Sequence, residues 1–149
     1  MHQIIKNYND YALGCRAVAA QLKRQRSGKI INISSVDATV GKNFEMYRDT
    51  GLSPTVPGYL ASKAALINLT RGIAVVLAPF GINVNSISPA GFFRNQPEAF
   101  VRSYSSRVPL KRMGTDGKDL KGAIAYLASA ASDHVTGHNL VVDGGWTAW

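Results

Sequence analysis

Apolar residues recur at three- and four-residue spacings near the start of the chain, which predicts an amphipathic helix from about Gln3 to Arg26. Gly28 follows its basic end, as is typical of a helix stop. A second helix is expected from Pro57 to about Ala78, because proline favours the first helical turn. The pattern therefore predicts two long helices, one on each side of a shorter apolar run.

Three short runs rich in β-forming residues predict strands at Lys29–Ile33, Ile82–Ile87 and Asn139–Val142. The first lacks strict alternation and suits a strand buried on both faces. We expect the second to stop at Pro89. Strands that alternate with helices indicate a parallel α/β sheet.

The remaining segments are shorter helices and a long loop. Helices are expected near residues 97–105 and 116–131, and Val36–Val56 is expected to be a loop. A loop of this length is uncommon in a compact domain and is usually functional or mobile. Since no repeat or linker interrupts the pattern, the chain is one domain or part of one.

Composition narrows the class of protein. The chain has 149 residues, of which 46% are hydrophobic and 17% charged, and this excludes intrinsic disorder. Cys15 is the only cysteine, so a disulfide framework is excluded and a reducing compartment is favoured. The uncharged stretch Gly72–Phe93 contains prolines and polar residues and is interpreted as buried helix, turn and strand. We find no export signal and expect a cytoplasmic protein.

Charge and histidine spacing indicate neither a nucleic-acid partner nor a metal. Seventeen Lys and Arg against nine Asp and Glu give a net charge of +8. The densest basic cluster ends the first helix, where cations complement the helix dipole, and the other basic residues are scattered. His134 and His138 are four apart, but Thr136 and Gly137 between them predict a turn and no acidic or thiolate ligands cluster nearby.

Tyr59 and Lys63 are four residues apart at the start of the second long helix and therefore share one face. A free tyrosine has a pKa of about 10, and a nearby ammonium lowers it toward neutral pH. The pair is a candidate general acid/base. Taken alone, the spacing arises often by chance, and the ordinary alternative is a surface tyrosine beside a solvated lysine.

Polar and small residues follow two of the predicted strands. Ser34 and Ser35 come directly after the first strand, and a loop of small residues, up to Gly91, follows the second. In open parallel sheets ligands bind outside the carboxyl ends of strands. A serine there can donate a hydrogen bond to a substrate oxygen, and small residues let backbone approach a ligand closely.

Four ordered motifs resemble the short-chain dehydrogenase/reductase family: GKIINISS, YLASKAAL, GINVNSISPAG and VTGHNLVVDGG, which begin at Gly28, Tyr59, Gly81 and Val135. The resemblance covers nearly the whole chain. It implies a Rossmann-type doubly wound parallel sheet in truncated form, with the last three strands and their flanking helices. Residues 1–149 would be a partial domain that lacks the amino-terminal, dinucleotide-phosphate-binding half.

The resemblance also implies a set of catalytic roles. Tyr59 matches the family's acid/base, and Lys63 matches the lysine that hydrogen-bonds the nicotinamide ribose and lowers the tyrosine pKa. Ser35 matches the serine that orients the substrate oxygen, with Ser34 as the alternative. Asn7 matches the asparagine of the preceding helix that keeps a water in the proton relay; Asn9 competes with it, and an ordinary surface amide is the alternative role.

The implied reaction is hydride transfer between NAD or NADP and a small carbonyl or alcohol substrate, in a protein that is a homo-oligomer when complete. Pro89, Ala90, Gly91 and Phe92 are implied to meet the nicotinamide. This segment departs from the family pattern. Ala90 stands where a glycine is usual, and the family's threonine slightly downstream is absent.

The loop between Ser35 and Tyr59 is longer than in most family members. It carries Lys42, Glu45, Tyr47, Arg48 and Asp49. This insertion and the chain's carboxyl-terminal residues are similar to those of gluconate 5-dehydrogenase-like and other sugar-acid members. Such a loop suits a polyhydroxylated or anionic substrate, and a solvated surface flap is the alternative.

None of the 14 glycines forms the family's phosphate-binding turn, and no upstream strand carries an acidic residue for the adenosine ribose. The choice between NAD and NADP therefore cannot be read from this sequence. Two hypotheses follow: the chain is a fragment of a dehydrogenase, or it is a non-catalytic or interaction subunit. Trp146 and Trp149 would then be oligomer contacts or packing within the chain.

Overall fold

The computed structural model describes residues 2–55 and 57–149, with the side chains of the first helix described from Asn9 onward. Three parallel strands form the central sheet in the order β1-β2-β5, with bounds Gly28–Ile33, Ile82–Pro89 and Asn139–Val142. Because the strands are parallel, their carboxyl ends meet at one edge. This confirms the expected parallel α/β sheet.

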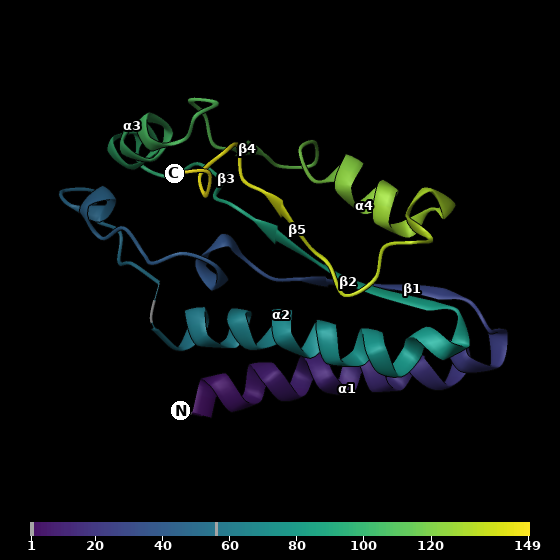
Figure 1. The fold of residues 1–149 in the computed structure, drawn as a ribbon. Coiled ribbons are helices and arrows are strands. Elements are labelled where there is room, and N and C mark those ends of the chain that lie inside the picture. The colour runs from purple at the N-terminus through teal and green to yellow at the C-terminus, as the bar shows by residue number, and fades with distance from the viewer. Residues whose placement is uncertain (1, 56) are drawn as a thin grey trace.

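Helices cover both faces of this sheet (Figure 1). The long helices α1 (His2–Gln25) and α2 (Pro57–Leu77) lie side by side on one face, and α4 (Lys121–Ala128) lies on the other. Helix α3 (Glu98–Arg107) lies beyond the carboxyl ends of the strands, near the carboxyl terminus of the chain. The arrangement is a partial doubly wound fold.

One apolar core lies between the two long helices and the sheet. Ala74 and Leu77 of α2 pack there against Ile82 and Val84 of β2. Pro57–Phe80 is long and apolar enough to cross a membrane by length and composition, and part of its apolar surface, including Ala74 and Leu77, supplies this core. The uncharged stretch Gly72–Phe93 includes the end of α2, a 3₁₀ turn at Ala78–Phe80 and strand β2, as expected, but Val75 and Val76 of α2 are exposed rather than buried.

The structure corrects the expected burial of β1 and the expected end of β2. Strand β1 is half-buried and Ile33 is 41% exposed, because β1 forms an edge of the sheet. Strand β2 continues through Pro89, which pairs with Val142. Pro89 is tolerated because the ladder there continues through the amide of Ala90, which donates to the carbonyl of Val142 at 3.1 Å.

The other differences from the expected elements are short. A second sheet pairs β3 (Phe92–Phe93) with β4 (Gly114–Thr115), which the sequence pattern does not reveal. The long loop contains two 3₁₀ turns, Val36–Ala38 and Glu45–Tyr47. The expected helix over 116–131 is limited to α4 and a 3₁₀ turn at Ala130–Ser132.

Candidate active site

A cavity of about 290 Å³ lies at the carboxyl ends of the strands. Its lining includes Ser35 and the loop after β1, Tyr59 at the start of α2, and the segment after β2 around Gly91. Tyr104 and Trp146 close it from α3 and the carboxyl terminus. The fold therefore brings the predicted serine, tyrosine and small-residue loop to one cavity.

Tyr59 and Lys63 lie on one face of α2, as their spacing predicts. The Lys63 Nζ lies 5.7 Å from the centroid of the Tyr59 ring. It donates hydrogen bonds to the Tyr11 hydroxyl at 2.7 Å and to the Ile33 carbonyl at 2.8 Å. Lys63 is buried, with 9% of its surface exposed, so it is not the solvated lysine of the alternative interpretation.

The two adjacent serines have different surroundings. The Ser34 hydroxyl donates to the backbone carbonyl of Lys63 at 2.8 Å and so joins the end of β1 to α2. The Ser35 oxygen accepts the amide hydrogen of Asp37 at 3.1 Å and lines the cavity with Tyr59. Since Ser35 Oγ is an acceptor in this bond, its own hydrogen can be donated to a ligand. The geometry favours Ser35 over Ser34 as the residue that meets a substrate.

The candidate asparagines lie at the beginning of α1. Asn9 is exposed to solvent. The side chain of Asn7 lies outside the described part of the structure. Tyr11, four residues after Asn7, contacts Lys63, and the sequence reasoning did not identify it.

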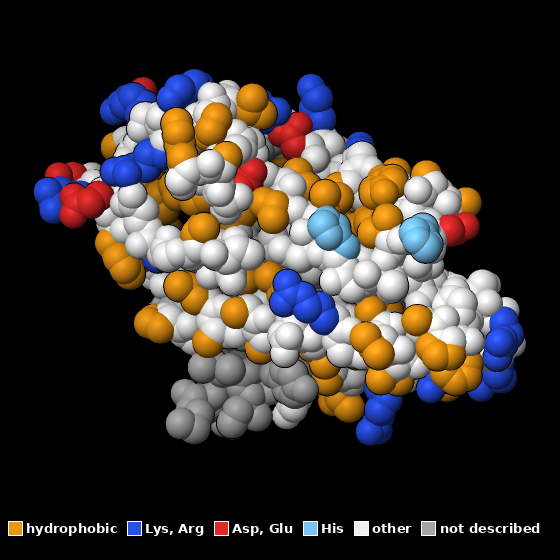
Figure 2. Space-filling view, in the orientation of Figure 1, with side chains coloured by type: hydrophobic (Ala, Val, Ile, Leu, Met, Phe, Trp, Pro, Cys, Tyr) orange, Lys and Arg blue, Asp and Glu red, His pale blue; other side chains and the backbone are white. Residues whose placement is uncertain are grey.

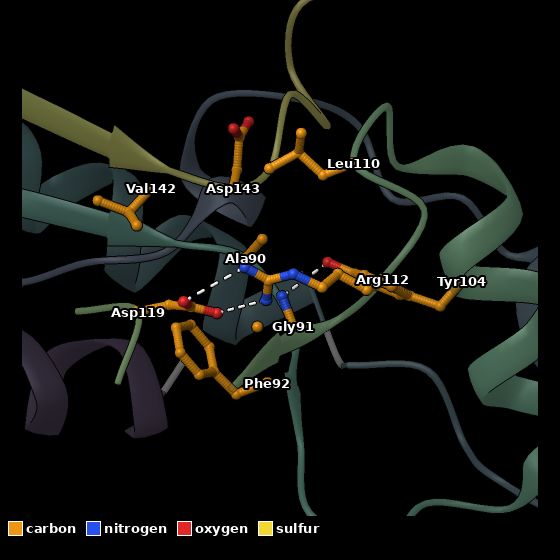
Figure 3. Close-up of a pocket in the computed structure, with 11 residues that line it drawn as sticks. Ala90, Gly91, Phe92, Tyr104, Leu110, Arg112, Asp119, Val142 and Asp143 are labelled. Atoms are coloured by element: carbon orange, nitrogen blue, oxygen red, sulfur yellow. Dashed lines mark hydrogen bonds and ion pairs between the residues drawn. The ribbon is translucent and has the colours of Figure 1, made fainter. Parts of the chain in front are cut away.

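Residues Pro89, Ala90, Gly91 and Phe92 connect β2 to β3. The last three line both the cavity above and a second cavity of about 200 Å³ (Figure 3). The backbone amide of Gly91 donates to the Tyr104 hydroxyl at 2.6 Å. The methyl group of Ala90 is accommodated here, so this departure from the family pattern does not close either cavity.

Charged side chains surround the second cavity. Arg112 reaches Asp119 in an ion pair, which together with the Thr115 amide lowers the pKa of Asp119 to about 2. Asp143 lies on the opposite side, at the end of β5 (Figure 3). Its carboxylate accepts hydrogen bonds from the Gly145 amide and from the amide and hydroxyl of Thr147.

A chain of aromatic rings forms one side of the first cavity. Ring centroids are 5.2 Å apart for Tyr47 and Phe100, 5.9 Å for Phe100 and Tyr104, and 4.7 Å for the stacked Tyr104 and Trp146. Burial raises the pKa of Tyr104 above its usual value, so its hydroxyl stays neutral. Trp146 thus packs within the chain, whereas Trp149 is 80% exposed. Helical or alternating patterns of hydrophobic residues do not predict this cluster, because its members come from separate loops and helices.

The long loop places one ion pair in the cavity wall. Lys42 Nζ lies 2.8 Å from Asp37 Oδ2, and the Lys42 side chain is 8% exposed. Burial opposes the charge on Lys42, but Asp37 and Tyr47 outweigh it and hold the Lys42 pKa above its usual value. The cation is therefore retained at neutral pH inside the cavity. Glu45, Arg48 and Asp49 lie farther along the loop and are exposed.

The described residues contain no cluster of three or more His, Cys, Asp or Glu side chains able to hold a metal ion. His134 and His138 are separated by turn and irregular backbone, as expected. Lys and Arg side chains are dispersed over the face seen in Figure 2 rather than gathered in one patch.

A family model described as enoyl-(acyl carrier protein) reductase matches residues 3–147. The chain belongs to the short-chain dehydrogenase/reductase family. Among relatives of this family, 5-keto-D-gluconate 5-reductase of Escherichia coli strain K12 is 38% identical over 149 residues, covering 95% of this chain and 54% of that protein. The FabG 3-oxoacyl-[acyl-carrier-protein] reductase of Staphylococcus aureus is 36% identical, covering 84% and 48%.

Solved structures of short-chain dehydrogenases have the same fold over this region. A Leptospira borgpetersenii enzyme with bound NAD⁺ is 35% identical, with a TM-score of 0.87 over 95% of this chain and 53% of that one. A Burkholderia cenocepacia gluconate 5-dehydrogenase in complex with NADP and tartrate is also 35% identical, with a TM-score of 0.78 over 91% and 51%. The chain spans about half the length of these relatives.

The residues present fit one end of the nicotinamide cofactor of the short-chain dehydrogenases. The Lys63 ammonium has three N–H donors and uses two of them in the bonds to Tyr11 and Ile33, so a third is available for a ribose hydroxyl. Ala90 and Gly91 line both cavities, and such small residues let a flat ring approach. The 149 residues contain no glycine-rich turn for the cofactor's phosphates.

Proposed function

We propose that residues 1–149 form the catalytic part of an NAD(P)-dependent oxidoreductase that interconverts a carbonyl and an alcohol. The carrying observation is that Ser35 and Tyr59 line one cavity, with the Lys63 ammonium beside Tyr59. The proposal includes NAD or NADP as cofactor, a cytoplasmic location, and no nucleic-acid or membrane partner. The support for this location is the cysteine content, since Cys15 is the only cysteine and the sequence has no disulfide framework.

Each side chain has a distinct task in this proposal. Ser35 donates a hydrogen bond to the substrate oxygen and orients it. The Tyr59 hydroxyl gives a proton to that oxygen when an alcohol forms and takes one when the alcohol is oxidised. Lys63 binds a ribose hydroxyl and holds positive charge next to Tyr59. The nicotinamide, when bound, supplies the hydride donor or acceptor, and Pro89 to Phe92 border it.

The substrate proposed is a sugar acid or a polyol. The support is the buried Asp37–Lys42 pair, which offers a carboxylate acceptor and an ammonium donor within the cavity that holds Tyr59. An ammonium in a poorly hydrated wall binds a carboxylate or hydroxyl strongly. The aromatic side formed by Tyr47, Phe100, Tyr104 and Trp146 suits the apolar face of a sugar chain. The names of the Escherichia coli and Burkholderia cenocepacia relatives agree with this class.

Turnover tests the reaction. The chain is incubated with 5-keto-D-gluconate and a high, non-limiting concentration of reduced nicotinamide nucleotide, because this chain by itself is expected to bind the nucleotide weakly. Nucleotide oxidation is followed by absorbance. Tyr59→Phe removes only the hydroxyl and is expected to lower kcat by about 10²- to 10⁴-fold. Tyr126→Phe, on α4 and 41% exposed, is the matched control and is expected to leave turnover unchanged. Near-normal turnover in Tyr59→Phe would contradict the assignment.

Binding tests the substrate class separately. Trp149→Phe leaves Trp146 as the only tryptophan, and Trp146 lines the cavity. Gluconate is expected to change its fluorescence more strongly than glucitol, which has hydroxyls but no carboxylate. Lys42→Met should reduce gluconate affinity about tenfold, since a charge-assisted hydrogen bond contributes about 1.5–3 kcal/mol. Equal affinity of Lys42→Met and the unaltered chain would exclude Lys42 as the anion-binding residue.

A second proposed role is homo-oligomer formation. The alternative to catalysis, in which the chain is a non-catalytic interaction module, rests on the same surface. The support is the neighbouring helices α1 and α2, where Leu13, Val18, Val75 and Val76 are between 46% and 76% exposed. Exposed apolar groups on neighbouring helices are typical of a protein–protein contact. Turnover separates the two roles, because the interaction module alone would associate without oxidising nucleotide.

A further inference from the structure

Tyr11 joins the first helix to the candidate active site. It lies on α1, and its hydroxyl oxygen accepts a hydrogen bond of 2.7 Å from Lys63 Nζ on α2. The ammonium also lies 4.9 Å from the centroid of the Tyr11 ring. The resemblance to the dehydrogenase family gave no role to this residue, which lies one helical turn beyond Asn7.

Lysine is held weakly unless several elements fix it, because its four-carbon stem rotates freely. Here the Lys63 ammonium is fixed by α1 through the Tyr11 hydroxyl and by β1 through the Ile33 carbonyl. The two bonds converge from different elements and leave one N–H donor. The Lys63 ammonium, which carries this remaining donor, lies 5.7 Å from the centroid of the Tyr59 ring.

We propose that Tyr11 is a positioning residue for Lys63. Its hydroxyl oxygen holds the ammonium in one place beside Tyr59, so that the third N–H donor faces an incoming hydroxyl group. The role toward Tyr59 rests on the proposed function, whereas the contact between Tyr11 and Lys63 can be measured without it.

The hydroxyl, rather than the ring, carries this role. A phenylalanine at position 11 would fill the same space and keep the ring beside the ammonium, but it would remove one of the two oxygen acceptors. An ammonium that is 9% exposed needs acceptors to offset its lost hydration. Without the Tyr11 oxygen, Lys63 would rotate toward other acceptors and lose its fixed place.

Nuclear magnetic resonance of chain labelled with ¹⁵N-lysine tests the contact. The Lys63 ammonium signal is assigned by its absence in Lys63→Arg. Tyr11→Phe is expected to speed exchange of the Lys63 ammonium hydrogens with water about tenfold or more, the factor that matches loss of one charged hydrogen bond. Tyr126→Phe on α4 is the control and should leave the exchange rate as it is. Unchanged exchange in folded Tyr11→Phe would overturn the proposal.

The reverse measurement covers the case in which Tyr11→Phe does not fold. Chain made with fluorotyrosine gives a ¹⁹F signal for Tyr11, and this signal should shift in Lys63→Met but not in Lys23→Met. A Tyr11 signal at the same chemical shift in Lys63→Met and in the unaltered chain would also overturn the proposed contact.

Turnover then tests the consequence. Tyr11→Phe should lower kcat about tenfold with little change in the KM of the carbonyl substrate, because Tyr11 is not among the residues that line the cavity. An unchanged kcat, with faster ammonium exchange, would contradict the positioning role. If the chain shows the contact but no turnover with any nucleotide, the proposed function fails and the contact stands.

Discussion

Gly91 shows how closely single residues are fitted at the candidate site. A Cβ added there would lie 2.8 Å from Tyr104 Cζ and 3.0 Å from its hydroxyl oxygen. The Tyr104 hydroxyl accepts a hydrogen bond from the Gly91 amide, and the Tyr104 ring is stacked on Trp146. The ring therefore cannot move away from Gly91 without losing both contacts. A glycine at this position therefore sets the distance between the loop after β2 and the aromatic side of the cavity.

We predict that Gly91→Ala lowers the free energy of unfolding by about 1–3 kcal/mol, as expected for overpacking against a buried ring. Gly122→Ala is the matched control, because a Cβ there has no atom within 4 Å and the residue lies in α4. It should raise stability by about 0.5–1 kcal/mol. Urea unfolding followed by tryptophan fluorescence measures both. Equal stability of the two variants would mean that Tyr104 moves freely.

At the scale of elements, the turn after β5 depends on one carboxylate. Asp143 is partly buried, which opposes its charge, but hydrogen bonds from Thr147 and Gly145 outweigh burial and hold the Asp143 pKa below its usual value. These bonds hold the segment that carries Trp146 over the cavity.

A depressed carboxyl pKa stabilises the fold only while the group is ionised. This stability is present above the unfolded pKa, about 3.9 for aspartate, and is lost as pH falls through the lower folded pKa. We predict that Asp143→Asn unfolds more easily at pH 7 by about 1–2 kcal/mol and that the difference shrinks in acid. Thermal unfolding at several pH values measures this. A difference that is constant with pH would show that ionisation of Asp143 does not matter.

The elements and the site differ in how far the sequence predicts them. Helices α1 and α2 and strands β2 and β5 follow from local patterns, because each buries one face or one run of residues. Tyr59 and Lys63 are also local, since one helical turn joins them. Strands β3 and β4 have two residues each, too few for a pattern, and form because Gly114 donates to the Gly91 carbonyl.

Contacts that depend on how separate elements pack could not be predicted. The Tyr11–Lys63 bond requires the register of α1 against α2, and the aromatic cluster requires α3 and the carboxyl terminus to meet. Half-burial of β1 was also hidden, because its apolar residues indicate a central strand whereas the topology places it at an edge. The periodicity of apolar side chains indicates which face of a helix or strand is buried. It does not indicate which other element packs against that face.

At the scale of the whole molecule, the 149 residues include the catalytic candidates but lack the usual means of binding a dinucleotide's phosphates. That task needs backbone amides at a glycine-rich turn and helix amino terminus, and no such turn occurs among the 149 residues. We predict that this chain by itself binds NADH with a dissociation constant weaker than the micromolar range. Fluorescence titration with NADH and NADPH measures it, and micromolar binding by the monomer would refute the prediction.

The homo-oligomer contact proposed above is assigned to α1 and α2. An apolar groove of about 340 Å³ runs between the helices, lined by residues that include Ala12, Ala19, Ile73 and Val76. We predict concentration-dependent association in analytical ultracentrifugation. Val76→Glu should weaken it about tenfold or more, because the contact would bury an unpaired charge. Phe44→Glu is the matched control, since both residues are 62% exposed but Phe44 lies in the long loop. If the two variants associate alike, α1 and α2 do not form the contact.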